Sequence, residues 1–200
     1  MANIRLVGAR ALLIEVDEPL AWHAELWRRR ESGELTARDI VPGARTVLVD
    51  GVPDPGALMS RLRKWRPDTT AAPESGPLVE IPVTFDGPDL AMVADRWACD
   101  DRGVAERMCA TEFRVAFSGF APGFAYLAGL PPELAVPRLE TPRTRVPAGS
   151  VGLAGNYAGI YPTASPGGWL LVGRTDVRLF DVTARPPALL TPGTRVKFTS

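Results

Sequence analysis

Residues 118–175 read SGFAPGFAYLAGLPPELAVPRLETPRTRVPAGSVGLAGNYAGIYPTASPGGWLLVGRT, and this stretch decides the fold of the larger part of the chain. About a third of its residues are glycine or proline, a composition that alone is typical of a disordered segment. Large apolar side chains such as Phe124, Tyr161 and Trp169 are spread through it, and they are too many to leave in water. The glycines and prolines therefore predict tight corners between short strands, as in a small β-barrel.

Positive charge is concentrated in the same stretch. It contains two acids, Glu133 and Glu140, and four arginines, Arg138, Arg143, Arg145 and Arg174. Guanidinium groups pair with carboxylate or phosphate oxygens, and clustered glycines let backbone N–H groups approach an anion closely. The pattern favours an anionic ligand, and the bracing of loops is the alternative use of these arginines.

The first third of the chain predicts a small α+β unit. Its expected elements are a strand pair over residues 4–16 with a turn at Gly8-Ala9, helices over 20–30 and 55–65, and a strand over 45–50. Asp54 is the expected N-cap of the second helix, with Pro55 at its first position. Helices laid on one face of an antiparallel sheet fit this order of elements.

A linker is expected over residues 66–77, RPDTTAAPESGP, because this segment contains no large apolar residue. We therefore expect a first domain over residues 1–77 and a second over residues 78–200. The second domain is predicted to contain strands at 78–85 and 113–117, helices at 89–97 and 101–109, a turn at 165–168, and two short strands within 177–198.

Composition and charge exclude several classes of protein. The chain has 200 residues, 46% of them hydrophobic and 23% charged, which is ordinary for a folded protein. The formal net charge is zero, which argues against a general nucleic-acid surface. Two cysteines, Cys99 and Cys109, are too few for a disulfide framework. With no charged-then-apolar leader and no apolar run of about 18 residues, a cytoplasmic location is expected, without a membrane span.

Familiar catalytic patterns are incomplete. Ser150 lies in AGSVG, residues 148–152, which resembles the GxSxG nucleophile elbow, but the only histidine is His23 in the first domain. A Ser-His-Asp triad is therefore not expected. No cluster of histidine, cysteine and carboxylate predicts a metal site, and the absence of lysine from residues 118–175 excludes a GxxxxGK[ST] phosphate loop there.

Six segments of the chain, in order, resemble one known family. They are GFAPGFAYL (119–127), PR (137–138), TPRTRVPAGSVG (141–152), GIYP (159–162), SPGGW (165–169) and GRT (173–175). They resemble the family that includes allophanate hydrolase subunit 1, the B subunit of 5-oxoprolinase and KipI, which has a carboxyltransferase-type domain. The resemblance implies an α+β N-terminal ferredoxin-like domain followed by a mainly-β cyclophilin-like barrel domain.

The resemblance also implies a function. It indicates the small subunit of an ATP-dependent amide or lactam hydrolase, first of all a 5-oxoprolinase that opens 5-oxoproline to glutamate and is active only with partner subunits. Those partners would be a larger homologous subunit, similar to the C subunit of 5-oxoprolinase or to allophanate hydrolase subunit 2, and a LamB/YcsF-type subunit. ATP is the implied co-substrate, with no metal and no biotin attached to this chain. The alternatives are a KipI-type inhibitor that binds a sporulation-type histidine kinase, and a biotin-dependent carboxyltransferase module.

Matching to the motifs of the family gives candidate site residues. The candidates for catalysis are Arg143, Arg145 and Ser150. The candidates for binding substrate or nucleotide are Phe120, Pro122, Gly123, Tyr126, Arg138, Asn156, Tyr161, Trp169 and Arg174. A lactam is a poor electrophile, and phosphorylation of its oxygen needs positive charge around the phosphates. The arginines would supply that charge, and Ser150 and Asn156 would donate hydrogen bonds to the ligand.

The chain departs from the pattern of the family at three places. Cys109 stands where the family usually has histidine, Thr84-Phe85 replaces Cys-Tyr, and Tyr157-Ala158 replaces Gln-Thr. Because these changes remove polar groups, the sequence leaves the true substrate open, together with the choice between an active and a regulatory protein.

Overall fold

The computed structural model describes residues 2–65 and 76–200. Contacts divide the chain after residue 75 into two compact units, 1–75 and 76–200. Most of the predicted linker, residues 66–75, lies outside the described residues. Its last two residues belong to the second unit: a Cβ on Gly76 would overlap the carbonyl oxygen of Gly193, and the carbonyl of Pro77 accepts the N–H of Arg195.

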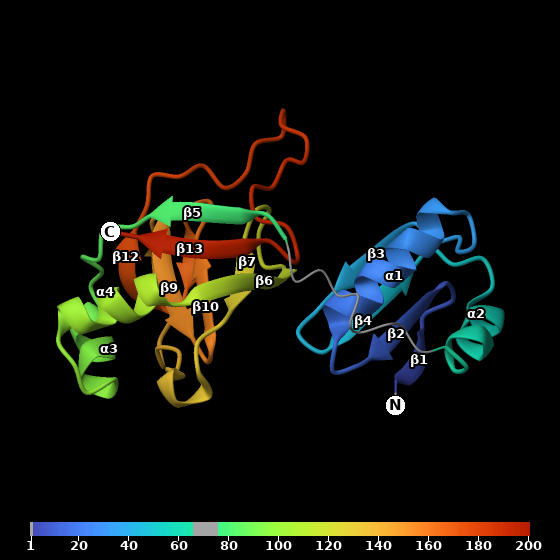
Figure 1. Cartoon of the computed structure of the whole chain (residues 1–200), viewed down its shortest axis with the longest axis horizontal. Helices are drawn as coiled ribbons and strands as arrows, with labels where there is room; N and C mark the ends of the chain where they lie inside the picture. The colour runs from blue at the N-terminus through green and yellow to red at the C-terminus, as the bar shows by residue number, and fades with distance from the viewer. Residues whose placement is uncertain (1, 66–75) are drawn as a thin grey trace. The chain divides into compact units, whose positions relative to one another are not determined.

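The first unit is a four-stranded antiparallel sheet covered on one face by two helices (Figure 1). Its elements are β1 (Asn3–Val7), β2 (Ala11–Glu15), α1 (Pro19–Glu31), β3 (Asp39–Pro42), β4 (Thr46–Asp50) and α2 (Pro55–Leu62). Alternate residues of the strands, such as Leu12 and Val47, pack with Leu26 of α1 and Leu58 of α2 in one core. Asp54 caps α2 as predicted, since its carboxylate accepts the N–H of Ala57 at 2.9 Å.

The strand order of this sheet is β1-β2-β4-β3. In a ferredoxin-like β-α-β-β-α-β unit, the strand that follows the second helix forms one edge beside the first strand. Among the described residues, that edge beside β2 is instead occupied by the N-terminal strand β1. Residues 2–65 therefore contain the predicted layer of helices on an antiparallel sheet, but the order of their strands is not the ferredoxin-like one.

The second unit is built on a curled seven-stranded sheet in the order β12-β9-β10-β7-β6-β13-β5. Its strands are β5 (Leu78–Pro82), β6 (Glu112–Ser118), β7 (Ala125–Ala128), β9 (Ser150–Ala154), β10 (Tyr157–Ile160), β12 (Leu170–Arg174) and β13 (Arg195–Thr199). Neighbouring strands are antiparallel except β5 and β13, which run side by side in the same direction (Figure 1). The curl brings the two ends of the sheet together, because Thr84, just after β5, exchanges two backbone hydrogen bonds of 2.9 Å with Arg174.

The two faces of this sheet carry different side chains. One face is mainly aliphatic, with the rings of Phe113 and Phe198 also buried in it, and it packs against α3 (Leu90–Arg96) and α4 (Asp101–Ala110). Leu127 and Leu153 are among its fully buried residues. Asp100 caps α4 by accepting the N–H of Gly103 at 2.8 Å. The other face carries an aromatic cluster that includes Phe124 and Trp169.

Two predictions for the second unit are wrong. Residues 165–168 were expected to form a turn, but Ser165–Gly167 is a strand, β11, that pairs with β8 (Arg143–Val146) in a two-stranded ribbon. Pro166 is tolerated there because the register shifts between Ser165 and Gly167.

The tail was expected to hold two short strands. It holds one strand, β13, and a single bridged pair, Phe180 and Ala188. Prolines at 186, 187 and 192 supply no N–H for a continuous ladder. A short 3₁₀ helix, η2 (Pro132–Leu134), completes the unit. In the described part of the chain, no helix combines the length and apolarity needed to cross a bilayer.

Candidate functional site

Aromatic rings cover one face of the curled sheet. Phe124, Tyr161 and Trp169 are buried, and the ring of Phe124 lies 5.4 Å from each of the other two, edge to face in both cases. Tyr126 is half-buried beside them, 5.5 Å from Trp169, and it stacks on Phe117 at 4.3 Å. Edge-to-face rings at such distances attract one another beyond the burial of their area. These rings therefore form one packed aromatic face, which is partly accessible at Tyr126.

Glycines let the rings lie directly on the strands. A Cβ at Gly159 of β10 would come within 3.0 Å of both Phe124 and Trp169. A Cβ at Gly152 of β9 would lie 3.1 Å from the Cβ of Trp169. Side chains at these two positions would lift the rings off the sheet. The glycine-rich pattern of the sequence thus has a specific use here, which is close packing of rings on backbone.

Phe120 lies at the edge of the aromatic face and has a strained backbone conformation. Its φ is +67°, in the left-handed region that non-glycine residues rarely adopt, and its side chain is 61% exposed. The turn around it is closed by hydrogen bonds from Ala121 to Gly119 and from Phe124 to Ala121. Strain of this kind costs about 1–3 kcal/mol and is concentrated at functional sites. An exposed ring held in this way is suited to contact a ligand.

The hydroxyl of Tyr161 lies among positive charges. Burial raises the pKa of Tyr161, and three influences oppose that rise: a backbone hydrogen bond with Trp169 and the charges of Arg138 and Arg143. Both guanidinium groups therefore act on the same hydroxyl. The structure thus brings Arg143, Tyr161 and Trp169 together, and the charge of Arg138 acts on the same hydroxyl. With its pKa raised, the hydroxyl stays protonated at neutral pH.

Arg143 is held in place by an acid that the sequence did not single out as a site residue. Its Nη2 lies 2.6 Å from Oδ1 of Asp89, which is 5% exposed and precedes α3. The other oxygen of Asp89 accepts the backbone N–H of Leu171 at 2.7 Å. The Nη1 of Arg143 donates to the carbonyl of Trp169 at 3.4 Å. Asp89 therefore fixes Arg143 against the edge of β12, which is a positioning role for the carboxylate.

Arg174 contacts a different acid from the one that holds Arg143. It ends β12, and its guanidinium pairs with Asp86 at 2.9 Å, in the loop that follows β5. Arg143 contacts the opposite end of the same strand, near Leu171. Arg174 is therefore already paired with an acid, and that acid is not the one that holds Arg143.

Arg138 and Arg145 are the arginines of this region that are exposed without an acid. Within residues 2–65 and 76–200, neither has a carboxylate at ion-pair distance. Arg145 follows Arg143 by two positions on β8, so both side chains leave the strand on the same side. These two guanidinium groups are the ones available for an external anion.

Ser150 and Asn156 lie at opposite ends of one hairpin. Ser150 begins β9 and is buried, whereas Asn156 lies in the exposed turn that joins β9 to β10. The length of β9 separates them by roughly 13 Å. The two residues therefore lie at different places along the hairpin, and their joint contact with a ligand stays a prediction. Ser150 lies at the same end as Tyr161, since its carbonyl accepts the N–H of Tyr161 at 3.0 Å.

The remaining predicted residues, Pro122 and Gly123, belong to the Phe120 turn. Gly123 has a φ of +83°, and a Cβ there would lie 2.7 Å from Phe180. Pro122 is exposed. These two residues shape the turn that carries Phe120.

Ser165 on β11 is a further residue that the sequence did not single out. Its hydroxyl is buried, and among the described residues it has no hydrogen-bond partner. It lies on the ribbon that carries Arg143, opposite Val146. No local signal in SPGGW distinguishes this serine from a turn residue, so only the pairing of the strands reveals it.

The titratable groups outside this region have structural surroundings. His23 on α1 is half-buried; burial lowers its pKa, and a backbone hydrogen bond with Ile40 opposes the change. Cys99 and Cys109 are free, partly buried and packed against the aliphatic core. In the part of the chain that is described, no group of three or more histidine, cysteine or carboxylate side chains could hold a metal ion.

The two residues of one departure from the family pattern, Tyr157 and Ala158, differ in their surroundings. Ala158 is fully buried on the helix-covered face, so its methyl group belongs to the aliphatic core. Tyr157 lies on the aromatic face, 5.7 Å from Phe117 and 5.9 Å from Tyr126. Only the change at Tyr157 therefore alters the surface next to the site.

Comparison with known proteins gives a match over nearly the whole chain. Residues 2–190 match the model of the family described as carboxyltransferase domain, subdomain C and D. The B subunit of 5-oxoprolinase from Escherichia coli O157:H7 is 38% identical over 98% of this chain and 95% of its own length. The B subunit of 5-oxoprolinase from Haemophilus influenzae is 36% identical over 98% of this chain and 96% of its own length.

A solved structure has the same fold. That structure, of TTHA0988, is 34% identical, matches with a TM-score of 0.77 and covers 95% of this chain. The present chain spans 39% of the length of that protein. The likeness in sequence and in fold therefore extends across both units.

Proposed function

The chain belongs to the carboxyltransferase-domain family, subdomains C and D, and from this membership we propose that it is the B subunit of a 5-oxoprolinase complex. The observation that carries the proposal is its match, over nearly the full length of both chains, to two proteins that are each named as the B subunit of 5-oxoprolinase. The reaction proposed is the ATP-dependent opening of the lactam ring of 5-oxoproline by water. It yields glutamate, ADP and phosphate.

The aromatic face is the proposed ligand-binding surface. Phe120 and Tyr126 offer exposed ring surface beside the buried rings of Phe124 and Trp169. A five-membered lactam is nearly flat and is therefore suited to pack against an aromatic ring. Tyr161 would support this surface from below, because its ring is buried and its hydroxyl is hydrogen-bonded to the backbone of Trp169.

Arg138 and Arg145 are the proposed anion-binding groups. Both are exposed. The substrate carries a carboxylate, and ATP carries phosphates, so either anion would be bound by a guanidinium fork. Arg143 has its charge balanced by Asp89, and its proposed role is to position the ribbon that carries Arg145. Arg174, paired with Asp86, is not included in this site.

The chemistry explains why positive charge is useful at this surface. An amide carbonyl is a poor electrophile, and transfer of a phosphoryl group to its oxygen would turn that oxygen into a leaving group. Positive charge placed where negative charge develops lowers the barrier for such a step. ATP as co-substrate is part of the proposal, and Arg138 and Arg145 are the residues of this chain that would contact its phosphates.

Partner subunits are also part of the proposal. The relatives are named as one subunit of an enzyme, and we propose a larger homologous subunit and a LamB/YcsF-type subunit as partners of this chain. The water nucleophile and its base would come from these partners. The complete active site would then form only on assembly.

The test is to co-express the chain with both partners and to measure glutamate and ADP from 5-oxoproline and ATP. We expect the two products in equal amounts, and none when this chain is omitted. Replacement of one charged donor at a site of this kind costs about a hundredfold in rate, so Arg145→Gln should lose about that much. Arg102→Gln is the matched control, because Arg102 is an exposed arginine on α4 that pairs with Glu106.

Two results would overturn different parts of the proposal. A soluble, associated complex of all three subunits that forms no glutamate would exclude the 5-oxoprolinase function. A complex that is active but unaffected by Arg145→Gln and Arg138→Gln would retain the function and exclude this surface as the site.

A further inference from the structure

A pocket lies within the first unit, between its two helices and the loop that follows α1. Its volume is about 190 Å³. We propose that this pocket binds a small carboxylate whose body is a single aromatic ring or a branched aliphatic chain. The proposal concerns residues 26–65 and does not depend on the 5-oxoprolinase function.

The lining of the pocket is mainly apolar. Its apolar residues are Leu26 of α1, Leu35 of the following loop, Leu58 and Leu62 of α2, and Trp65. The four leucines belong to the buried core of the unit, so the pocket reaches down to that core. Trp65 contacts Trp22 edge to face at 4.8 Å. The greater part of any ligand must therefore be hydrocarbon.

The polar residues of the lining are all cations. They are Arg29, Arg61 and Lys64. Arg29 is neutralised by Glu25 at 2.9 Å and Glu34 at 3.5 Å, and it also lies over the ring of Trp65 at 4.5 Å. For Arg61 and Lys64, the described residues provide no carboxylate at ion-pair distance. Two positive charges therefore remain for an anionic group at the rim.

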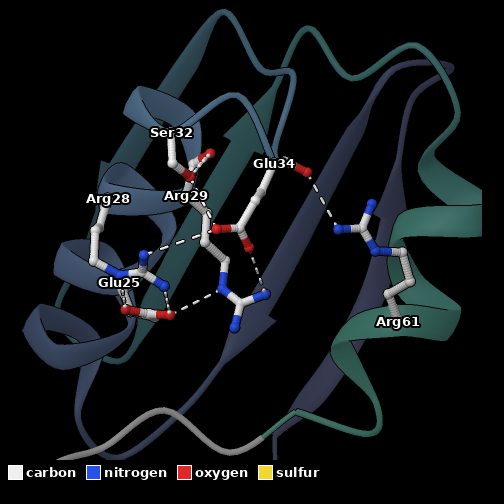
Figure 2. A network of polar contacts seen from close by, with 6 residues as sticks. All are labelled: Glu25, Arg28, Arg29, Ser32, Glu34 and Arg61. Carbon is white, nitrogen blue, oxygen red and sulfur yellow. Dashed lines mark hydrogen bonds and ion pairs between the residues drawn. The ribbon is translucent and has the colours of Figure 1, made fainter.

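A network of polar contacts holds the rim in position. Figure 2 shows Glu25, Arg28 and Arg29 on α1 linked to Glu34, and Arg61 on α2 donating to the backbone carbonyl of Glu34. That last hydrogen bond is 3.2 Å long and joins the two helices through the loop between them. Hydrogen bonds from Arg28 and Arg29 lower the pKa of Glu25 to about 2, so this network stays ionised at neutral pH.

Size and charge together define the ligand. An apolar cavity of about 150 Å³ accommodates benzene, so 190 Å³ is sufficient for one ring with a short substituent. A carboxylate on that substituent would pair with Arg61 at the rim. The negative end of the α2 dipole lies at the same place and offsets part of the positive charge. The affinity for a charged ligand, compared with the affinity for a neutral analogue of the same shape, therefore tests the proposal.

The test uses ¹⁵N-labelled full-length protein titrated with phenylacetate. The five tryptophans give five indole N–H signals, and a Trp65→Phe variant identifies that of Trp65. We expect the Trp65 signal to shift to saturation, while the signals of Trp97 and Trp169 in the second unit stay in place. The neutral analogue phenylacetamide should bind at least about tenfold more weakly, because it loses a charge-assisted hydrogen bond.

Two variants and a control separate the pocket from general charge effects. Arg61→Gln should weaken phenylacetate binding about tenfold. Leu58→Phe should abolish it by filling the space, with the dispersion of the other signals as the check on folding. Arg63→Gln is the control, because Arg63 lies one position beyond the end of α2 and is not part of the lining.

Three results would overturn the proposal. One is a Trp65 signal that does not move at millimolar phenylacetate. The second is equal binding of the acid and the amide. The third is equal weakening by Arg61→Gln and Arg63→Gln. These readouts require neither partner subunits nor ATP, so failure here is distinct from failure of the 5-oxoprolinase proposal.

Discussion

The two faces of the seven-stranded sheet are made by alternate residues of the same strands. On β9, Val151 and Leu153 face the helices, while Gly152 lies under Trp169 on the other face. On β10, Ala158 belongs to the helix-covered core, and Gly159 lies under Phe124. One set of residues is aliphatic and buried by α3 and α4. The other combines glycines with rings whose margin is exposed.

The two faces therefore differ in their main roles. The helix-covered face stabilises the fold, and the aromatic face is the proposed binding surface. Aliphatic side chains on the covered face remove a large area from water, which is the main stabilising term in folding. The aromatic face buries rings too, but the strained Phe120 lies at its edge. The ribbon of β8 and β11 also holds the buried hydroxyl of Ser165, which has no partner among the described residues. We therefore expect changes on the first face to act on stability and changes on the second to act mainly on binding.

The largest expected effect tests the aliphatic face. Leu153 is fully buried, so Leu153→Ala should lower the free energy of unfolding by about 2–5 kcal/mol. Urea unfolding followed by circular dichroism measures this change. The affinity of the folded protein for its ligand should stay within about twofold, since Leu153 faces away from the rings. A large loss of affinity at full folding would contradict the separation of the two faces.

The second effect tests the residue that joins the two faces. Asp89 precedes α3 and holds Arg143 on the other side of the β12 edge. Asp89→Asn should lower the free energy of unfolding by about 2 kcal/mol, below the value for a fully buried pair because Arg143 is 28% exposed.

The matched control for this change is Asp86→Asn. Asp86 pairs with Arg174, and both side chains are largely exposed. Pairs of that kind contribute about 1 kcal/mol or less. If both variants lose the same stability in urea unfolding, Asp89 has no special positioning role.

The third effect should have the opposite sign. Phe120→Gly removes a side chain from a left-handed backbone conformation, which should raise the free energy of unfolding by up to about 1 kcal/mol. The same variant should bind ligand more weakly, because the exposed ring is lost. Thermal unfolding and a binding titration on the same sample measure the two effects. A loss of stability would show that the contacts of Phe120 with Phe124 and Tyr161 outweigh its strain.

The smallest effect depends on pH, and it is specific to the aromatic face. Because burial raises the pKa of Tyr161, the folded state resists ionisation that the unfolded state accepts at about pH 10. The contribution of this group to stability is complete below pH 10 and falls as the pH rises through the higher folded pKa. Unfolding midpoints between pH 8 and pH 11 should therefore fall less steeply for Tyr161→Phe than for the unchanged protein. Parallel curves would contradict this expectation.

Local signals in the sequence predicted most elements of the fold. Asp54 begins a helix as expected, because capping depends on residues only three positions apart. The strand pair over residues 4–16 was confirmed because its turn and alternation are local as well. The order of the strands in a sheet is not a local property, so it could not be predicted in the same way. The position of β1 at the edge of the first sheet is an example.

The site was harder to predict, because its contacts join distant residues. Asp89 and Arg143 are 54 positions apart, and nothing near either residue indicates the pair. The ribbon of β8 and β11 was mistaken for a turn because SPGG is typical turn chemistry and the pairing partner lies about twenty residues away. The number of rings predicted only that they pack together, since so many apolar side chains need a common place to pack, and it was the resemblance to the family that made them site candidates.

The parallel pairing of β5 and β13 determines how the second unit would respond to mechanical force. β5 is its first strand and β13 its last, and they are paired from Arg195–Leu78 to Thr199–Pro82. Tension between the two ends of this unit would pull the strands in opposite directions along their length. All the paired positions would then share the load and break together, as in shear, and not one after another as in unzipping. Single-molecule pulling on the ends of this unit should therefore record one high-force rupture.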